Sequence, residues 1–403
     1  MSVLFGHPGG NPNSHHAALA HFEAGRLEAF CVPWMPSRRT IASFEFIPLL
    51  RNMSRRFSRR AFAPLETAPK IQGRVGELQR LITRGLGFGD EGLSYEANDW
   101  LMKTMLRACR RPAVTAVHSY EDCSLWQFEE AKRLGKACIY DMPIGYYPAW
   151  ERTQAELIKK YAAWLPEGGL PSGRWVRPEQ KKKEMELADI VLAPGGFVES
   201  TIKEFHPYKQ VARAPYGVDL EFWRPSGEKR DRRKLRFIYA GQLSLRKGIP
   251  LLLEAWECAN LRDAELVMVG SWQLSERKGA VLPAGVRHLP ACSSSELRTQ
   301  FQDADIFVFP SYFEGFGLVL TEALACGLPA IASMATAGPD VLTAECGKLI
   351  PTGNIEALVD ALRWFHEYRD ALPGMRLAAR RAAEACTWEN YRRRVTEAVT
   401  PFV

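Results

Sequence analysis

The sequence lacks the marks of a secreted or membrane-spanning protein. The residues after Met1 show no basic stretch followed by an apolar run of roughly 7–15 residues, and no later window holds about 18 uncharged apolar residues in succession. We therefore expect a cytoplasmic protein, with peripheral contact to the inner face of a membrane as the only membrane association.

Metal-binding and disulfide patterns are also missing. The nine cysteines contain no Cys-x-x-Cys pair, and their odd number fits neither a disulfide framework nor a zinc site. We expect reduced thiols that are mostly buried as small apolar residues. Internal repeats of roughly 20 to 50 residues are not visible, which argues against solenoids and propellers.

Length and apolar content favour two domains. With 403 residues, 46% of them hydrophobic, the chain is longer than a single hydrophobic core usually accommodates. Short β-like runs alternate with helical patterns, which is typical of doubly wound parallel sheets. In the first half we expect strands at 3–6, 28–33, 113–117, 137–140 and 190–193 and helices at 16–24 and 125–134. In the second half we expect strands at 237–240, 265–269, 305–309 and 330–333 and helices at 249–258, 295–301 and 318–326.

The alternation lapses twice. Residues 36–97 are rich in Arg, Pro and Gly, so we expect this insertion to lie over one end of the sheet rather than inside it, where it would govern acceptor specificity. A charged segment then precedes the strand at 237–240. We predict a first domain at 1–215, a second at 216–386, and a last helix at 387–400 that packs back on the first.

The net charge of +7 is unevenly placed. Five arginines fall within ten residues: Arg51, Arg55, Arg56, Arg59 and Arg60. A helix there would gather these charges beside apolar Phe57, as in helices that lie on anionic membranes; the alternative is a solvated surface helix. We expect no nucleic-acid partner, because aromatic residues do not alternate with the basic ones as a single-strand platform requires.

The most informative stretch runs from Asp305 to Ser333 and reads as one β-loop-α-β unit. Its glycines, Gly315 and Gly317, let backbone N–H groups approach a ligand closely. The N–H groups from Phe316 through Leu318 to Val319 would open a helix without intrahelical partners, at the positive end of its dipole. Ligands of open α/β sheets bind at the carboxyl ends of the strands, which is where these N–H groups lie. We therefore expect them to bind a phosphate.

Two glutamates of this unit suit sugar hydroxyls. Carboxylates accept hydrogen bonds in pairs, so Glu314 fits a hexose and Glu322, one to two helical turns further on, fits a ribose. Two glutamates eight residues apart are also common on solvated helices, so the pair by itself is weak. Its surroundings carry the argument.

The pattern Glu314-x7-Glu322 resembles the signature of family 4 retaining glycosyltransferases of the GT-B fold. Three further segments are similar to that family, and together they cover most of residues 185–350: Ala240-Gly-Gln-Leu-Ser-Leu-Arg-Lys-Gly248, Pro215-Tyr-Gly-Val-Asp-Leu-Glu-Phe-Trp-Arg-Pro225 and Glu186-Leu-Ala-Asp-Ile-Val-Leu-Ala-Pro194. The resemblance implies two Rossmann-like domains facing each other across a cleft. It also implies transfer of a sugar, with retention, from a UDP- or GDP-type donor to a glycan, lipid-linked or small-molecule acceptor.

The resemblance assigns roles to the loop after residue 240. Gly241 opens the loop, and Arg246 and Lys247 match the cationic pair that holds the donor diphosphate and stabilises the departing nucleotide. Gln242 departs from the family, which usually has Arg there, so Arg246 carries more of the phosphate charge. With this pair, and with no Asp-x-Asp at a strand end, we expect neither a metal nor a cofactor.

The first domain offers less certain matches. Gly9 and Gly10 resemble the glycine-rich loop that closes over the diphosphate, with Asn13 nearby as a cleft candidate. Asp141 stands where the family often has a histidine that contacts the donor sugar, although an Asp at a strand end is as often a turn or cap residue. His118, at the end of a predicted strand, either lines the cleft or is a buried structural imidazole.

Two other classes of function remain open at this point. A phosphorylase or sugar-nucleotide epimerase would use the same fold without a separate acceptor. A basic membrane- or nucleic-acid-binding protein of GT-B type would have lost catalysis.

Overall fold

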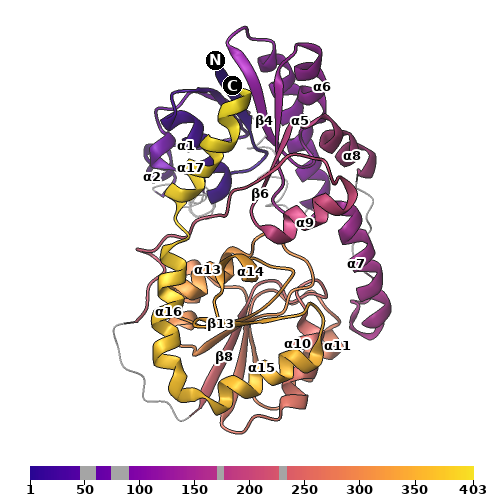
Figure 1. The fold of residues 1–403 in the computed structure, drawn as a ribbon, viewed down its shortest axis with the longest axis vertical. Coiled ribbons are helices and arrows are strands. Elements are labelled where there is room, and N and C mark those ends of the chain that lie inside the picture. The colour runs from indigo at the N-terminus through magenta and orange to yellow at the C-terminus, as the bar shows by residue number, and fades with distance from the viewer. Residues whose placement is uncertain (46–59, 74–89, 170–176, 227–233) are drawn as a thin grey trace.

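Two α/β domains are stacked along the long axis of the molecule (Figure 1). The computed structural model describes residues 1–45, 60–73, 90–169, 177–226 and 234–403. Each domain is built on a sheet whose strands all pair in parallel. The predicted α/β architecture is therefore confirmed.

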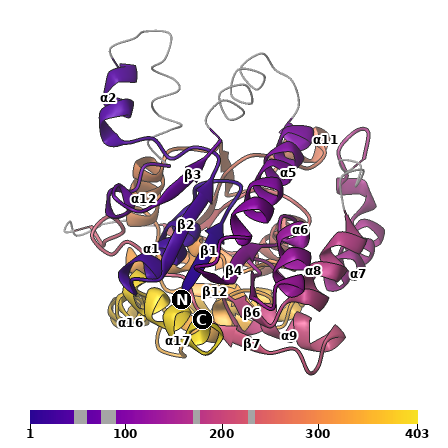
Figure 2. The same ribbon diagram turned by 90° about the horizontal axis from the view of Figure 1, so that it is seen from above.

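The first domain holds a 7-stranded sheet in the order β3-β2-β1-β4-β5-β6-β7. Its strands are β1 (Ser2–Gly6), β2 (Leu27–Val32), β3 (Lys70–Gln72), β4 (Val114–Tyr120), β5 (Ala137–Asp141), β6 (Ile190–Ala193) and β7 (Val211–Arg213). Its helices are α1 (Pro12–Glu23), α2 (Arg38–Glu45), α5 (Asp90–Cys109), α6 (Leu125–Arg133), α7 (Tyr147–Lys160), α8 (Pro178–Leu187) and α9 (Gly196–Phe205). Figure 2 shows these helices on both sides of the sheet.

The second domain holds a 6-stranded sheet in the order β10-β9-β8-β11-β12-β13. Its strands are β8 (Leu235–Ala240), β9 (Ala264–Val269), β10 (Val286–Leu289), β11 (Ile306–Phe309), β12 (Ala330–Ser333) and β13 (Gly347–Ile350). The helices of this domain are α10 (Ile249–Ala259), α11 (Glu276–Gly279), α12 (Ser294–Gln302), α13 (Leu318–Ala325), α14 (Gly338–Val341), α15 (Ile355–Glu367) and α16 (Leu372–Glu384), and the chain ends in α17 (Trp388–Val399).

The central strands are rich in apolar residues because helices cover both of their faces. Ile306–Phe309 and Ala330–Ser333, for example, are buried at every position. In both sheets the chain first adds strands on one side of the starting strand and then reverses to the other side. The reversals lie between β1 and β4 and between β8 and β11.

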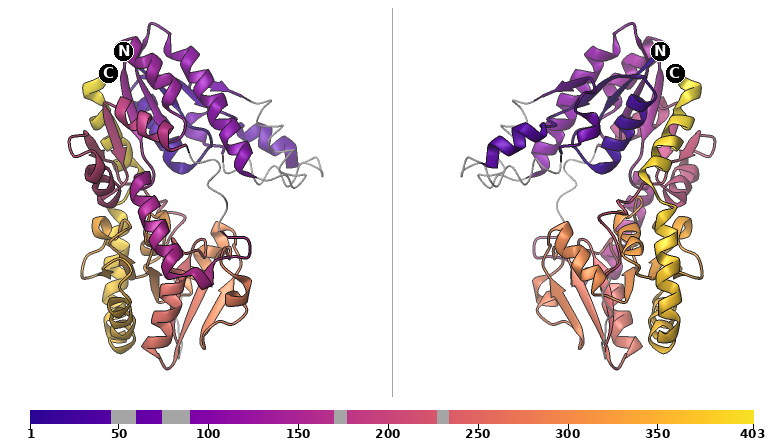
Figure 3. Two further views of the ribbon diagram at one scale, coloured as in Figure 1. Left: turned by 90° about the vertical axis from the view of Figure 1, so that its right-hand side faces the viewer. Right: turned by 90° about the vertical axis from the view of Figure 1, so that its left-hand side faces the viewer.

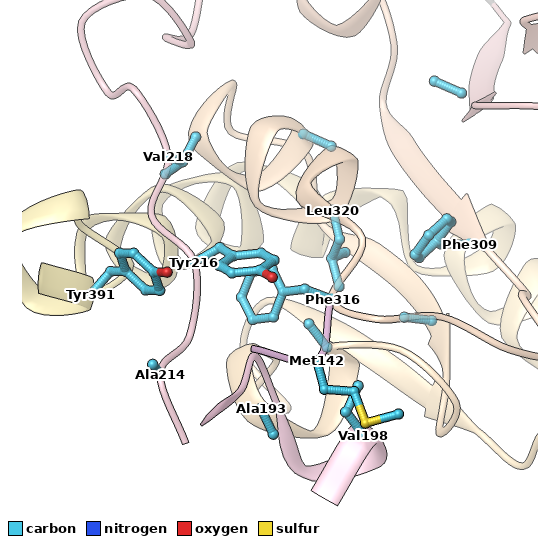
Figure 4. Packing of buried hydrophobic residues seen from close by; sticks show 14 of the residues in the cluster. Met142, Ala193, Val198, Ala214, Tyr216, Val218, Phe309, Phe316, Leu320 and Tyr391 are labelled. Atoms are coloured by element: carbon cyan, nitrogen blue, oxygen red, sulfur yellow. The ribbon is translucent and has the colours of Figure 1, made fainter. Parts of the chain in front are cut away.

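The chain crosses between the domains at two adjacent places. Residues 214–218 lead into the second domain, residues 385–388 return from it, and the Val218 N–H donates to the Cys386 carbonyl at 3.0 Å. The last helix, α17, then packs on α1 of the first domain, so both chain ends lie there (Figures 1 and 3). Tyr216 of the first crossing fills the junction, between Tyr391 of α17 and Phe316, with ring centroids 5.6 Å from each (Figure 4).

Some expectations need correction. Helix α1 begins at Pro12 rather than residue 16, because the Asn11 side chain accepts from the Ser14 N–H and caps it. Strand β4 continues to Tyr120. The segment 36–97 was expected to lie outside the sheet, but it contributes the edge strand β3, which pairs with β2.

Other expectations concern cysteines, membrane helices and the arginine cluster. All nine cysteines are free thiols, and only Cys258 and Cys292 are exposed. Among the described residues, no helix has the length and apolar character that crossing a membrane would require. Arg51, Arg55, Arg56 and Arg59 lie outside the described residues, so the predicted basic helix stays a prediction.

Candidate active site

The carboxyl ends of β8 and β11 form the natural ligand position of the second domain. Strand order reverses between these two strands, and the loops that follow them diverge to opposite faces of the sheet. The loop after β8 carries Arg246 and Lys247, and the loop after β11 carries Glu314. The two loops touch: a Cβ on Gly248 would lie only 2.2 Å from the Pro310 carbonyl oxygen, so only glycine fits there.

Arg246, Lys247 and Glu314 form a compact charged cluster. The Lys247 ammonium donates to Glu314 Oε1, and Arg246 Nη1 lies 3.5 Å from the same oxygen. The Ser311 hydroxyl also donates to Glu314 Oε1, at 3.2 Å. Glu314 is only 5% exposed. Sequence reasoning missed Ser311, although it lies three residues before Glu314 in the same loop.

The cluster keeps one positive charge in excess. Two cations surround one carboxylate, and burial lowers the pKa of Lys247 while Glu314 opposes part of that shift. Arg246 is oriented by a second bond, from Nη1 to the Phe313 carbonyl oxygen at 2.8 Å. A site of this composition attracts a diphosphate, which brings more negative charge than the single carboxylate it meets.

Glu322 is the unpaired carboxylate of the site. It lies on α13, which starts at Gly317 with no side chain capping its first N–H groups. Burial raises the pKa of Glu322 to about 7. Among the described residues, neither a hydrogen bond nor an ion pair to its side chain is recorded, so Glu322 is available to accept from a ligand hydroxyl.

A cavity of about 1080 Å³ opens at the carboxyl ends of β8, β9 and β10, and its lining does not include Arg246, Lys247 or Glu314. Ser244 and Leu245, which directly precede Arg246, line it together with Trp272 and Gln273. The first domain supplies another wall through residues 166–169. That segment follows α7, which reaches from the first domain down beside the second (Figure 3), and the Ser275 N–H donates to the Trp164 carbonyl at 2.9 Å.

The predicted glycine loop of the first domain follows β1. Gly9 donates its N–H to His7 Nδ1 at 2.9 Å, and a Cβ on Gly10 would come within 3.0 Å of His15 Nε2. Asn13 is almost fully buried. Its side-chain amide donates to the Tyr216 hydroxyl at 3.3 Å, so Asn13 ties α1 to the domain junction.

Asp141 ends β5 and is 2% exposed. Its Oδ2 lies 3.6 Å from His118 Nε2, and the His118 Nδ1 lies 2.9 Å from His21 Nε2. Because β4 extends past residue 118, His118 is fully buried and does not line an open cleft. The buried structural imidazole, the other interpretation of His118, is the one that fits.

The loop that follows Asp141 meets the loop that carries Glu314. The Gly145 N–H donates to the Glu314 carbonyl oxygen at 3.3 Å, across the domain boundary. The predicted site residues of the two domains are therefore neighbours through their loops. Among the described residues, no group of three or more His, Cys, Asp or Glu side chains has the arrangement of a metal site.

The two facing doubly wound domains and the charged cluster at a strand-order reversal define a protein of the GT-B fold. The family model "glycosyl transferases group 1" matches residues 221–384, in the second half of the chain. The resemblance inferred from the motifs is therefore confirmed as a resemblance to glycosyl transferases group 1, and the assignment to family 4 stays a prediction.

Relatives and solved structures agree with this. The D-inositol 3-phosphate glycosyltransferase of Paenarthrobacter aurescens (strain TC1) is 28% identical over 262 residues, which cover 56% of this chain and 64% of that protein. The sucrose-phosphate synthase tll1590 from Thermosynechococcus elongatus superposes with a TM-score of 0.65 at 16% identity, over 100% of this chain and 98% of that one. Anabaena Alr3699/HepE, solved with UDP and glucose, has a TM-score of 0.61 at 12% identity, with 100% of both chains covered.

The structural similarity extends over the whole chain, whereas the sequence matches to the first curated relatives cover 39% to 56% of it. The matched segments span about half the length of the first curated relatives, between 44% and 64%. At these low identities the solved structures establish the fold.

Proposed function

We propose that this protein is a glycosyltransferase that moves a sugar from a nucleoside diphosphate sugar to an acceptor. The observation that carries the proposal is the cluster of Arg246, Lys247 and Glu314 at the strand-order reversal of a group 1 domain. Anabaena Alr3699/HepE was solved with UDP and glucose, which makes a UDP-sugar the first donor to test.

The two cations are assigned to the donor diphosphate. In the free protein they share Glu314 as a counter-ion, and a bound diphosphate replaces part of that pairing. Glu314 is then released to accept hydrogen bonds from sugar hydroxyls, while Glu322 accepts from the ribose. Arg246 and Lys247 also stabilise the negative charge that builds up on the leaving nucleoside diphosphate. This supports a reaction that needs neither metal nor cofactor.

We propose that transfer retains the anomeric configuration through a front-face route. The bond between the sugar C1 and the phosphate oxygen breaks, the acceptor oxygen bonds to C1 from the same face, and the leaving phosphate oxygen takes the acceptor proton. Asp141 lies on the first-domain side of this arrangement. His118 Nε2 lies 3.6 Å from the Asp141 carboxylate.

The acceptor is proposed only as a class: a glycan, a lipid-linked sugar or a small hydroxylated molecule. The P. aurescens relative is named for D-inositol 3-phosphate, so that compound is a useful first acceptor to try. The arginine cluster of residues 51–60 is our candidate for docking the enzyme on an anionic membrane, close to a lipid-linked acceptor.

The proposal is tested by nucleotide binding. UDP, GDP, ADP and their common sugar conjugates are titrated calorimetrically into wild type, Glu322→Ala and the control Glu257→Ala, without added metal. Glu257 is an exposed glutamate on α10 of the same domain. We expect one nucleotide to saturate wild type and the control, and to bind Glu322→Ala about tenfold more weakly, in line with loss of hydrogen bonds to a charged group. Absence of binding by every nucleotide would reject the proposed function.

A further inference from the structure

The loop that carries Glu314 touches the first domain at four consecutive residues. The Tyr312 hydroxyl lies 3.2 Å from the Tyr161 hydroxyl. The Glu314 carbonyl oxygen accepts from Gly145, and a Cβ on Gly315 would lie 1.7 Å from the Pro143 carbonyl oxygen. The fourth of these residues, Phe313, makes the most extensive of these contacts.

Phe313 points out of its own domain and is nevertheless 2% exposed. Its ring lies 5.3 Å from Trp150 on α7 and 5.2 Å from Phe197 on α9, in a T-shaped arrangement with the latter. A Cβ on Gly145 would come within 2.5 Å of its ring, so the first domain has no spare space around it. Two helices and one loop of the first domain thus form a socket for this ring.

The same four-residue segment is also held from inside the second domain. Arg246 donates to the Phe313 carbonyl oxygen at 2.8 Å, and the Tyr312 N–H donates to the Arg246 carbonyl oxygen at 2.8 Å. The loop of the cationic pair and the loop after Asp141 therefore both contact residues 312–315. Any rotation of one domain against the other must move this segment relative to one of them.

We propose that Phe313 is an interdomain anchor and a positioning residue. Its ring in the Trp150–Phe197 socket fixes where Glu314 stands relative to the Asp141 loop, and so assembles the two halves of the site. The role in turnover rests on the proposed function. The role in holding the domains together does not, and can be tested without any substrate.

The first test measures domain separation by small-angle X-ray scattering of the full chain. We expect the radius of gyration to increase in Phe313→Ala and Trp150→Ala, and to increase less in Phe313→Leu, which keeps apolar volume in the socket. Tyr208→Ala is the matched control, because it removes an aromatic ring of the first domain that is 99% exposed. An unchanged radius of gyration in folded Phe313→Ala, with melting at the wild-type temperature, would overturn the anchor.

The second test measures turnover of whichever donor the nucleotide panel identifies. In Phe313→Ala we expect kcat to fall about tenfold or more, because the reacting groups lose their relative position, while the Kd of the nucleoside diphosphate stays within about threefold. Because Phe313 and Trp150 act as one contact, the double alanine variant should lose no more than the worse single variant. The positioning role would be contradicted if the losses of the two single variants multiplied in the double variant, or if kcat were unchanged in Phe313→Ala. A wild type without nucleotide binding would reject the proposed function and leave the scattering result to decide the anchor.

Discussion

Glu322 has a raised pKa, and no hydrogen bond to its side chain is seen among the described residues. Burial disfavours its charge, which brings its pKa to about 7, within the range where the protein would work. In the function proposed above, a ribose hydroxyl donates to this carboxylate, which would favour the ionised form. Binding of the nucleotide and ionisation of Glu322 are therefore linked.

The linkage predicts a pH dependence of donor binding. Because the ligand prefers ionised Glu322, the affinity for a nucleoside diphosphate sugar should increase as the pH rises from 6 to 8 and then level off, by up to about tenfold for each unit below the free pKa. Calorimetry in buffers of different ionisation enthalpy should show proton release near pH 6. Glu322→Gln is the control, and a pH profile as steep as that of wild type in this variant would exclude Glu322 as the group responsible.

At the residue scale, Gln242 is a departure from the family pattern in the same loop as Arg246 and Lys247. Gln242 is exposed, and its carbonyl oxygen accepts from the Tyr239 hydroxyl at 2.8 Å. An Arg in its place would add a third cation to a cluster that already has two cations for one carboxylate. Arg246 and Lys247 carry the positive charge of this site.

At the scale of elements, the two domain crossings depend on one close backbone approach. A Cβ on Gly217 would lie 2.2 Å from the Trp388 nitrogen and 2.6 Å from the Thr387 carbonyl carbon, which are backbone atoms that cannot rotate away. Gly217→Ala should therefore push the crossings apart, loosen α17 from α1, and lower the melting temperature by several degrees, as a loss of roughly 1–3 kcal/mol would. Differential scanning calorimetry measures this.

The chain offers a matched glycine for comparison. Gly374 lies within α16, and a Cβ there would meet nothing within 4 Å. Gly374→Ala should raise the melting temperature, because alanine is about 1 kcal/mol more favourable than glycine inside a helix. If Gly217→Ala left the melting temperature unchanged or raised it as Gly374→Ala does, the close approach at Gly217 would not control the crossing.

Elements with strong local signals were predictable from the sequence, and long-range partners were not. The strand at 330–333 and the strand at 190–193 have the predicted bounds, because each is an apolar run between clear breakers. Helix α1 was expected to start late, although Asn11 and Pro12 are a recognisable cap and first-turn pair. The burial of His118 depended on where β4 ends, which strand propensity alone does not determine.

The candidate site shows the same division. The spacing of Glu314 and Glu322 and the Arg246-Lys247 pair indicated which residues to examine, because those motifs are local. The contact of Lys247 with Glu314, and the contacts of Phe313 with Trp150 and Phe197, join residues more than 60 positions apart. Such pairings follow from tertiary packing, and a single sequence carries no signal for them.

At the scale of the whole molecule, we expect the two domains to respond differently to acid. Burial holds the pKa of His7 and of His15 at about 4 and that of His16 at about 3, and it holds the pKa of His21 well below its usual value. All four histidines lie in or next to α1 of the first domain. In the unfolded chain each would take up a proton near pH 6.5.

These shifts predict that the first domain loses stability in mild acid before the second. Because each folded-state pKa is depressed, the stabilisation is complete above pH 6.5 and is lost as the pH falls toward 4, at up to about 1.4 kcal/mol per pH unit for each histidine. Hydrogen exchange at pH 7.5 and 5.5, corrected for intrinsic rates, should show α1 amides losing protection. Amides of α10, a helix of the second domain whose residues are mostly buried, are the internal control. Equal losses in α1 and α10 would mean that the domains unfold as one unit, with the interdomain contacts outweighing the histidines.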